Sequence, residues 1–335
     1  MYEISPPYLH FLGAAPDRLT TKTSIGVHQW RPEYSVGQYR LEGCQGDLGI
    51  EDLSIDAAVQ RGAKTLIIGV ANRGGVFSDE WAEPIVQALN AGLDVVSGLH
   101  ARLIDQPEFV AAAAANGQRL IDVRFPKGPF QVATGARRTG SRVLTVGTDC
   151  SCGKMYTSLA IEREMRSRGM DADFRATGQT GIMIAGDGAP VDAMIADFIS
   201  GAAEALSPSN QPEHWDLIEG QGSLFHPSFA GVSLGLMHGS QPDWLVMCHE
   251  PTRTHMRGLP DYHLPTLQAC IDANLDAARL TNENVRLAGL SINTFALGEA
   301  EAAALVEELS TQFGLPACDP VRHGVADIVD VLMGA

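Results

Sequence analysis

A glycine-rich stretch that follows an apolar run carries the clearest chemistry in the sequence. Residues 147–154 read GTDCSCGK, and they lie between a predicted strand, RVLTVG, and a predicted helix from Lys154 to Arg168. This order matches the phosphate-binding loop, in which backbone N–H groups and the positive end of a helix converge on an anion and a lysine adds its charge. We predict an anion site formed by Gly147, Thr148, Asp149, Cys150, Ser151, Cys152, Gly153, Lys154, Met155 and Tyr156.

The loop departs from the usual pattern at its last position. Met155 stands where a serine or threonine normally holds Mg²⁺, and Thr157 lies further along the helix and points elsewhere. Phosphoryl transfer relies on that metal to neutralise developing charge. The sequence therefore favours a loop that holds phosphates without cleaving them, and we expect no metal requirement.

Cys150 and Cys152 form a C-x-C pair inside this loop. A helix N-terminus lowers the pKa of a thiol, so a redox, metal-binding or acyl-carrying role is the chemical alternative. No second Cys or His pair with metal-ligand spacing lies nearby in the sequence, which makes zinc a weak interpretation. We favour small packing residues.

Three side chains are candidates for a proton acceptor near the loop. Glu219, in WDLIEGQGS, ends a strand that should lie beside the strand of the loop, where a carboxylate acts as a base or holds a metal-bound water. Asp149 lies in the loop itself. His226 follows the Glu219 segment, although a lone histidine is more often a hydrogen-bonding surface or core residue. We rank Glu219 first as a catalytic residue, followed by Asp149 and His226.

Residues at other strand ends are candidates for substrate binding. In ATGQTGIMIAG, two glycines predict a tight turn that presents Gln179 and Thr180. Arg73 and Arg253 each follow a predicted strand, where a guanidinium binds a carboxylate through two bonds; a salt bridge to one of the chain's own acids is the alternative. HEPTRTH is not a zinc motif, because Pro251 interrupts the helix that would place both histidines on one face.

Two runs of alternating strands and helices must position these residues. The first lies between residues 65 and 123, the second begins at residue 142, and a segment rich in Pro and Gly separates them. Residues 1–60 offer few periodic segments, and we expect them to wrap a core formed later. The predicted fold is α/β, with a Rossmann-like parallel-sheet domain over residues 1–135 and a doubly wound P-loop domain over residues 136–335.

The chain's 335 residues carry a formal net charge of -16. This balance disfavours nucleic acid and anionic membrane surfaces, and points to a small-molecule substrate. The sequence shows no signal-peptide pattern and no apolar stretch of about 18 residues, so we expect a cytoplasmic protein outside the membrane. Its six cysteines are too sparse for a disulfide scaffold.

The motifs together resemble those of the DgcN-type D-glutamate N-acetyltransferases. The segments KTSIGV, VGQYRLEGC, GAKTLIIGVANRGG, GTDCSCGKM, TGQTGIMIAG, EGQGSL and HEPTR follow the order of that family over nearly the whole chain. GTDCSCGKM and EGQGSL also resemble the distantly related dethiobiotin synthetases, whose loop ends in G-K-T. Met155 separates this chain from those ATP-using enzymes.

The resemblance implies acetyl transfer from acetyl-CoA to the amine of D-glutamate, with the loop holding the phosphates of CoA. On chemical grounds we assign Arg73 and Arg253 to the two carboxylates of glutamate. An ATP-dependent ligase or carboxylase and a non-catalytic nucleotide-binding regulator remain the alternatives. A homo-oligomer is expected, because metabolic enzymes of this class are often symmetric oligomers.

Overall fold

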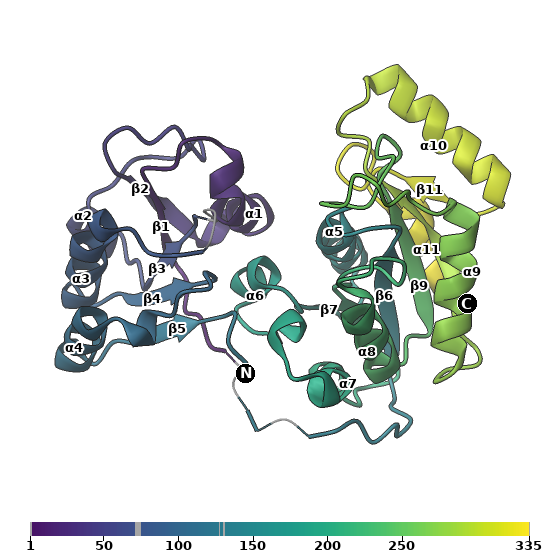
Figure 1. The fold of residues 1–335 in the computed structure, drawn as a ribbon, viewed down its shortest axis with the longest axis horizontal. Coiled ribbons are helices and arrows are strands. Elements are labelled where there is room, and N and C mark those ends of the chain that lie inside the picture. Colours follow the sequence, from purple (N-terminus) through teal and green to yellow (C-terminus); the bar gives the residue numbers. More distant parts are fainter. Residues whose placement is uncertain (1, 71–74, 127, 130, 335) are drawn as a thin grey trace. The chain divides into compact units, whose positions relative to one another are not determined.

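The computed structural model describes residues 2–70, 75–126, 128–129 and 131–334 (Figure 1). The chain forms two compact units. The first unit contains residues 1–127 and 178–193, and the second contains residues 128–177 and 194–335. The domain boundary that we expected after residue 135 did not anticipate this arrangement. Residues 178–193 follow the P-loop in sequence but belong to the first unit.

The first unit contains a five-stranded parallel sheet with the strand order β2-β1-β3-β4-β5. All six residues of β1 (Tyr8–Gly13) are buried, and β1 lies between β2 and β3. The expectation that residues 1–60 wrap a core formed later is therefore wrong, because β1 is part of that core. The other strands are β2 (Ser35–Arg40), β3 (Thr65–Ile68), β4 (Asp94–Ser97) and β5 (Leu120–Asp122).

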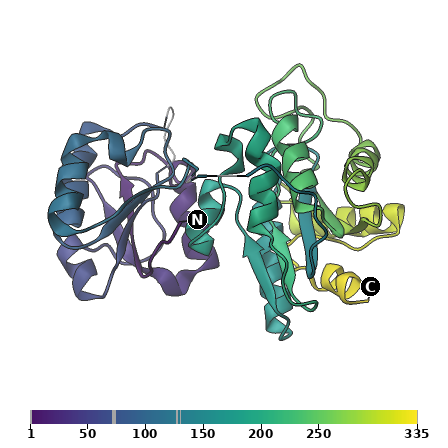
Figure 2. The same cartoon turned by 90° about the horizontal axis from the view of Figure 1, so that it is seen from below.

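Helices cover both faces of this sheet, as Figures 1 and 2 show. On one face, Leu9 and Phe11 of β1 pack in one apolar cluster with Ile85, Leu89 and Phe109 of the helices. On the other face, α6 packs against α1. The helices are α1 (Lys22–Trp30), α2 (Ile55–Gln60), α3 (Ala82–Asn90), α4 (Pro107–Asn116) and α6 (Gln179–Ala185), with short 3-10 turns η1 (Leu19–Thr21), η2 (Pro32–Tyr34), η3 (Asp79–Trp81), η4 (Leu103–Asp105) and η5 (Val191–Ala193).

The second unit contains a six-stranded parallel sheet with the order β11-β10-β9-β6-β8-β7. β6 (Ser141–Gly147) pairs with β8 on one side and β9 on the other. Because the chain passes from β8 to β9 across β6, the topological switch point lies at the carboxyl end of β6, where doubly wound sheets bind ligands. The other strands are β7 (Ala172–Arg175), β8 (Trp215–Ile218), β9 (Trp244–His249), β10 (Arg286–Ile292) and β11 (Ala317–Cys318).

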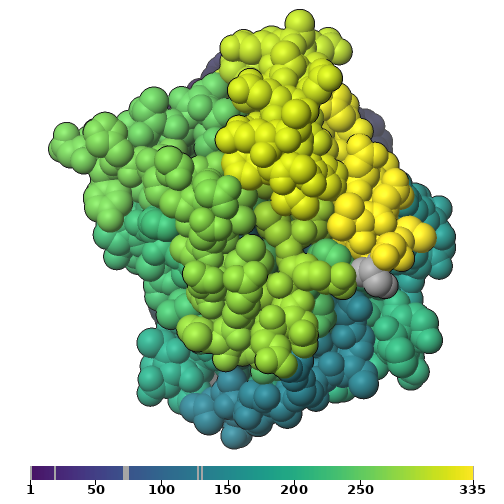
Figure 3. Space-filling model, turned by 90° about the vertical axis from the view of Figure 1, so that its right-hand side faces the viewer, coloured from purple at the N-terminus to yellow at the C-terminus, as the bar shows by residue number. Residues whose placement is uncertain are grey.

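The helices of the second unit also form two layers. α5 (Lys154–Ser167) contacts β6, β7 and β8, and α11 (Ala326–Met333) packs against α5; α7 (Ala196–Leu206), α8 (Ala230–Ser240) and α9 (Leu267–Arg279) pack in sequence over the other face. α10 (Glu299–Phe313) lies at the surface seen in Figure 3, and Ala302 is its buried residue. Among the described residues, no helix has the length and apolar character needed to cross a bilayer.

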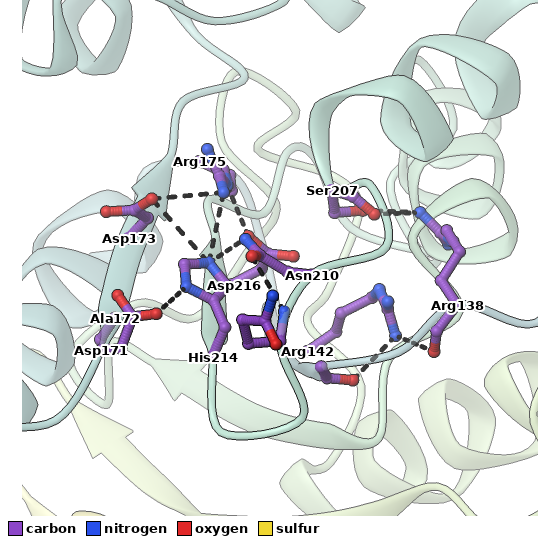
Figure 4. A network of polar contacts seen from close by, with 12 residues as sticks. Arg138, Arg142, Asp171, Ala172, Asp173, Arg175, Ser207, Asn210, His214 and Asp216 are labelled. Carbon is purple, nitrogen blue, oxygen red and sulfur yellow. Dashed lines mark hydrogen bonds and ion pairs between the residues drawn. The ribbon is translucent and has the colours of Figure 1, made fainter.

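Arg138 joins the ends of two of these helices, and Figure 4 shows its contact with Ser207. Its guanidinium donates hydrogen bonds to the carbonyls of Glu204 and Ser207 near the end of α7, and to those of Gly239 and Ser240 at the end of α8, over 2.6–2.9 Å. The last carbonyls of a helix lack partners inside the helix. One side chain thus satisfies the ends of two neighbouring helices.

A second network in the same view links β7 to β8. His214 contacts Asp171 through Nδ1 at 2.9 Å and Asp216 through Nε2 at 3.2 Å, and Arg175 donates from Nε to Asp216 at 2.5 Å (Figure 4). These contacts fix the edge strand beside the strand that precedes Glu219.

Candidate active site

The P-loop joins β6 directly to α5. Ser151 and Gly153 adopt positive φ angles of 54° and 109°, which turn the chain tightly before the helix begins. The backbone N–H groups of Ser151, Cys152, Gly153 and Lys154 have no hydrogen-bond acceptor among the residues that the structure describes. Several unpaired donors at the start of a helix are the arrangement that binds a phosphate.

The side chain of Lys154 lies inside this loop. It is 6% exposed, and its Nζ donates to the carbonyl of Asp149 at 2.7 Å and contacts Cys152 Sγ at 3.6 Å. A Cβ added to Gly220 would come within 1.7 Å of the Thr145 carbonyl and within 3.0 Å of Lys154 Cδ. The glycine in EGQG therefore allows the acidic loop to pass close to the lysine.

Thr157 does not replace the hydroxyl that Met155 lacks. Its Oγ1 lies 3.0 Å from the carbonyl of Gly153 and 2.7 Å from Ser291 Oγ, within the packed interior between α5 and β10. The prediction that Thr157 points away from the loop is confirmed. The site therefore lacks the residue that normally carries Mg²⁺ at this place.

Asp149 is a structural acceptor at the centre of the loop. It is 1% exposed, and its Oδ1 accepts from the N–H of Cys150 at 2.7 Å. Its Oδ2 accepts from Arg253 Nη1 at 2.6 Å and from the N–H of Arg257 at 2.8 Å. Both carboxylate oxygens of Asp149 thus already accept hydrogen bonds from the protein. Asp149 stays a predicted proton acceptor, but it would have to give up one of these donors.

Arg253 pairs with two acids of the chain itself. It forms salt bridges with Asp149 and Glu250, and donates to the carbonyl of Cys150 at 2.6 Å. Burial lowers the pKa of this guanidinium, but the hydrogen bond to Asp149 and the charges of both acids outweigh it, so the pKa is raised overall. Arg253 stays a predicted ligand of the substrate, but it would have to exchange one of these acids for a substrate carboxylate.

His226 lies beside the loop, although it is distant in sequence. One ligand atom each from Asp149, Cys150 and His226 lies within 4.8 Å of the others. The imidazole is 2% exposed; its Nδ1 accepts from the N–H of Ser228 and its Nε2 lies 3.2 Å from the carbonyl of Arg257. A cation here would displace these bonds and would face Arg253. The sequence placed Asp149 and His226 near the loop, but spacing along the chain did not predict that Cys150 joins them in one cluster.

The two loop cysteines fit a packing role better than a reactive one. Burial raises the pKa of the Cys150 thiol, while Lys154 opposes that shift. Cys152 is buried, and its Sγ lies 3.1 Å from the carbonyl of Asp149. A Cβ added to Gly147 would come within 2.5 Å of that sulfur. The thiols therefore fill the inside of a tight turn.

Glu219 lies immediately after β8, next to the strand of the P-loop, as its place in the sequence predicts. It is 5% exposed, and its Oε2 accepts from the N–H of Thr177 at 2.9 Å. Thr177 also receives a hydrogen bond from Gln221 at 3.1 Å. Glu219 therefore lies buried at the predicted place and stays a predicted proton acceptor.

Two curated relatives cover nearly all of this chain. A D-glutamate N-acetyltransferase from Tritonibacter scottomollicae is 54% identical over 329 residues, which are 98% of this chain and 99% of the relative. A D-glutamate N-acetyltransferase from a Pseudoalteromonas species is 49% identical over 327 residues, which are 98% of each chain.

Family models and a solved structure agree with this similarity. Residues 131–329 match the P-loop domain, and residues 39–126 the Rossmann-like domain, of the family described as a domain of unknown function, DUF1611. The chain belongs to the DUF1611 family. A crystal structure of a DUF1611 family protein from Anabaena variabilis has a TM-score of 0.84 and 33% identity, and the match covers 98% of this chain and 100% of that one. The predicted resemblance and the predicted α/β class, Rossmann-like first and P-loop second, are confirmed.

Two of the predicted substrate residues belong to the first unit. Gln179 and Thr180 are not in a tight turn, because they begin helix α6, which belongs to the first unit. There Gln179 lines a cavity together with residues of the Rossmann-like sheet. Arg73 lies outside the described residues.

The sequence analysis did not name several residues that hold the loop. Thr148 Oγ1 lies 3.0 Å from Nδ1 of His249, the last residue of β9, and the Thr148 carbonyl accepts from Ser223 Oγ at 3.1 Å. Burial lowers the pKa of His249, which favours the neutral imidazole in this contact. The signal was their position at the ends of strands that flank β6, since parallel strands bring their carboxyl ends to one edge.

Proposed function

We propose that this protein transfers the acetyl group of acetyl-CoA to the amine of D-glutamate. Both curated relatives are named for D-glutamate N-acetylation, and they align with 98% of this chain at 54% and 49% identity. The observation that supports the donor is a P-loop without its hydroxyl. The amides of residues 151–154 have no acceptor among the described residues, Lys154 lies inside the turn, and Met155 replaces the residue that carries Mg²⁺. Such a loop suits CoA phosphates, which are bound and not cleaved.

The proposed mechanism is direct transfer in a ternary complex. The ammonium of the acceptor must lose a proton before its nitrogen attacks the thioester carbonyl, and we assign that proton to Glu219. The nitrogen–carbon bond forms, and hydrogen-bond donors stabilise the tetrahedral oxyanion. The carbon–sulfur bond then breaks, and the departing thiolate takes up the second proton that the nitrogen loses, which gives the amide and the free CoA thiol. Asp149 and His226 are the further candidates. Asp149 would have to give up a bond to Arg253 or Arg257, and His226 its bond from Ser228.

A thiol-release assay tests this function. Acetyl-CoA is mixed with the protein and D-glutamate, L-glutamate or D-aspartate, each with and without Mg²⁺-ATP. We expect thiol release and an acetylated amine with D-glutamate, and no dependence on ATP. Turnover that requires ATP would favour a ligase of the dethiobiotin synthetase kind, and the absence of thiol release with every acceptor would reject the proposal.

A further inference from the structure

The first unit contains a cavity of about 180 Å³ that the P-loop does not contribute to. Its volume is below the roughly 300–1,000 Å³ of clefts that hold drug-sized ligands, so it suits a small molecule or one end of it. Polar side chains line the cavity, together with the backbone of a glycine: Lys22, Thr23, His100, Arg124, Gln179 and Gly98.

The cavity lies at the topological switch point of the Rossmann-like sheet. The chain leaves β1 toward β2 on one side and returns to β3 on the other, so the crevice opens at the carboxyl ends of β1 and β3. Ile68, the last residue of β3, lines it, and so do Lys22 and Thr23 in the first turn of α1. The Thr21 side chain does not cap this helix.

The charged side chains that line the cavity are cations. Lys22, Arg124 and the imidazole of His100 line it, and no carboxylate is among its lining residues in the described part of the chain, although Asp192 pairs with Arg124 from outside the lining. This is unusual in a protein with a formal net charge of -16. A local group of cations at a concave surface favours an anionic ligand over the rest of the acidic surface.

Two side chains retain hydrogen-bonding capacity. Arg124 donates from Nε to the Gly98 carbonyl at 3.1 Å and from Nη1 to Asp192 at 3.3 Å, while its Nη2 has no partner among the described residues. Thr23 is 3% exposed, and its hydroxyl likewise has no partner in the part of the chain that the structure describes. The Thr23 hydroxyl is not among the buried atoms without a partner, so it is open to the cavity and can donate to a ligand there.

Gln179 adds an amide to the same wall. A Cβ added to Gly98 would come within 2.4 Å of Gln179 Oε1, so only glycine at position 98 allows the amide to reach this depth. The cavity thus combines a guanidinium held by a backbone carbonyl, a lysine, a hydroxyl and an amide. This set matches a carboxylate, which accepts hydrogen bonds at both oxygens.

We propose that this cavity binds a carboxylate of the acceptor amino acid. The identity of the acceptor rests on the proposed function, but recognition of the carboxylate does not. Arg124 donates to the carboxylate from Nη2, Thr23 donates from its hydroxyl, and Lys22 supplies charge. A phosphate of the acyl donor is the other anion that this chemistry accepts, and the experiment separates the two.

Calorimetry with the full-length protein tests the site without turnover. D-glutamate and glutarate, a dicarboxylate without an amine, are titrated in the presence of saturating CoA. For Arg124→Gln we expect dissociation constants for both ligands to rise about ten- to a hundredfold, and for Thr23→Val about three- to tenfold. Arg61→Gln is the matched control, because Arg61 is an exposed arginine of the same unit whose salt bridge to Glu51 lies outside the cavity lining. It should change neither constant.

Kinetics then identify the source of the anion. Arg124→Gln should raise the Michaelis constant for D-glutamate and leave that for acetyl-CoA unchanged. A rise for acetyl-CoA instead, equal glutarate binding by Arg124→Gln and the unmodified protein, or no glutarate binding at all would overturn the proposal. Arginine-dependent glutarate binding without any thiol release would leave the site intact and reject the proposed function alone.

Discussion

At the scale of single residues, Lys154 is the side chain on which the assignment of the loop depends. Its ammonium lies inside the turn, where it donates to the Asp149 carbonyl. Under the proposed function, the ammonium turns from this carbonyl to a phosphate of CoA. Because charged hydrogen bonds contribute about 1.5–3 kcal/mol, Lys154→Ala should raise the Michaelis constant for acetyl-CoA about ten- to a hundredfold and change kcat less. Steady-state kinetics measure both. Lys64→Ala, at an exposed lysine, is the control, and an unchanged constant in Lys154→Ala would reject CoA binding by this loop.

The loop cysteines give a second prediction. Burial raises the pKa of Cys150, so little thiolate is present at neutral pH, and direct transfer needs no acyl-thiol. Cys150→Ala should therefore keep most of the activity. Intact-mass spectrometry of the unmodified protein after mixing with acetyl-CoA alone should show no added acetyl group. A stoichiometric adduct that Cys150→Ala abolishes would establish a two-step mechanism.

His10 makes folding stability depend on pH. It is fully buried in β1 between Ser24 and Ser35, and burial, together with His28, lowers its pKa to about 3. Between pH ~6.5 and pH 3 the unfolded chain binds a proton at His10 that the folded chain does not, so stability falls as the pH falls. The contribution is about 1.4 kcal/mol per pH unit within that window.

Urea unfolding from pH 4 to 6.5 measures this effect. The slope of the free energy of unfolding against pH should be shallower in His10→Asn than in the unmodified protein by about 1.4 kcal/mol per pH unit. Nuclear magnetic resonance gives an independent check, because the His10 ring signals should not titrate in this range. Equal slopes, or a titrating ring, would contradict the burial of a neutral imidazole.

The sequence predicted the order of strand, loop and helix around residues 147–156, but not which residues contact the loop. Residues 147–156 are contiguous, so a local pattern defines their geometry. The approach of His226 to Asp149 and Cys150, and the salt bridge of Asp149 with Arg253, depend on which loops meet at the carboxyl edge of the sheet. Spacing along the chain cannot define such contacts, because they arise from tertiary packing.

At the scale of elements, the errors have a local cause. YLHFLG was not recognised as a strand, because it is short and its surroundings contain Pro, Gly and aromatic residues; pairing with β2 and β3 on both sides makes it a strand. QTGIMIA was interpreted as a turn because of its glycines. Burial of Ile182 and Met183 against the rest of the protein overrides that weak helix propensity.

Arg138 provides a prediction about two elements at once. Its guanidinium satisfies carbonyls at the ends of α7 and α8, and burial lowers its pKa to about 10. Arg138→Met leaves those carbonyls without a donor, which should lower the free energy of unfolding by about 2–4 kcal/mol. Urea unfolding measures the loss, and hydrogen exchange should accelerate in the last turns of both helices.

Arg137→Met is the matched control for this experiment. Arg137 is the exposed neighbour, and its contact with Asn282 spans 3.4 Å. Surface substitutions of this kind change stability by less than about 0.5 kcal/mol. If the two variants lose the same stability, or if exchange at α7 and α8 does not change, Arg138 does not hold the helix ends.

At the scale of the whole molecule, the most important feature is that residues 178–193 belong to the first unit. The N-terminal segment of the first unit depends on this segment, because the N–H of Tyr2 donates to Asp187 Oδ1 at 2.9 Å and that of Ile4 to the Gly186 carbonyl at 3.2 Å. α6 also packs against α1. A chain cut at the linker therefore loses part of the first unit, although the linker is where sequence analysis places a boundary.

We predict that a fragment of residues 1–127 is much less stable than the same fragment joined through a short Gly/Ser linker to residues 178–193. Without that segment, α1 exposes the surface that α6 covers. Each fully buried side chain of the segment, such as Ile182 or Met183, contributes about 1.5–3 kcal/mol to the free energy of unfolding. Thermal unfolding followed by circular dichroism should show a cooperative transition at a clearly lower temperature, or none, for residues 1–127 alone. The linked fragment carrying Ile182→Asp should resemble the short fragment, since its added segment can no longer bury that position. Equal melting of residues 1–127 and the linked fragment would mean that the second segment adds nothing to the stability of the first unit.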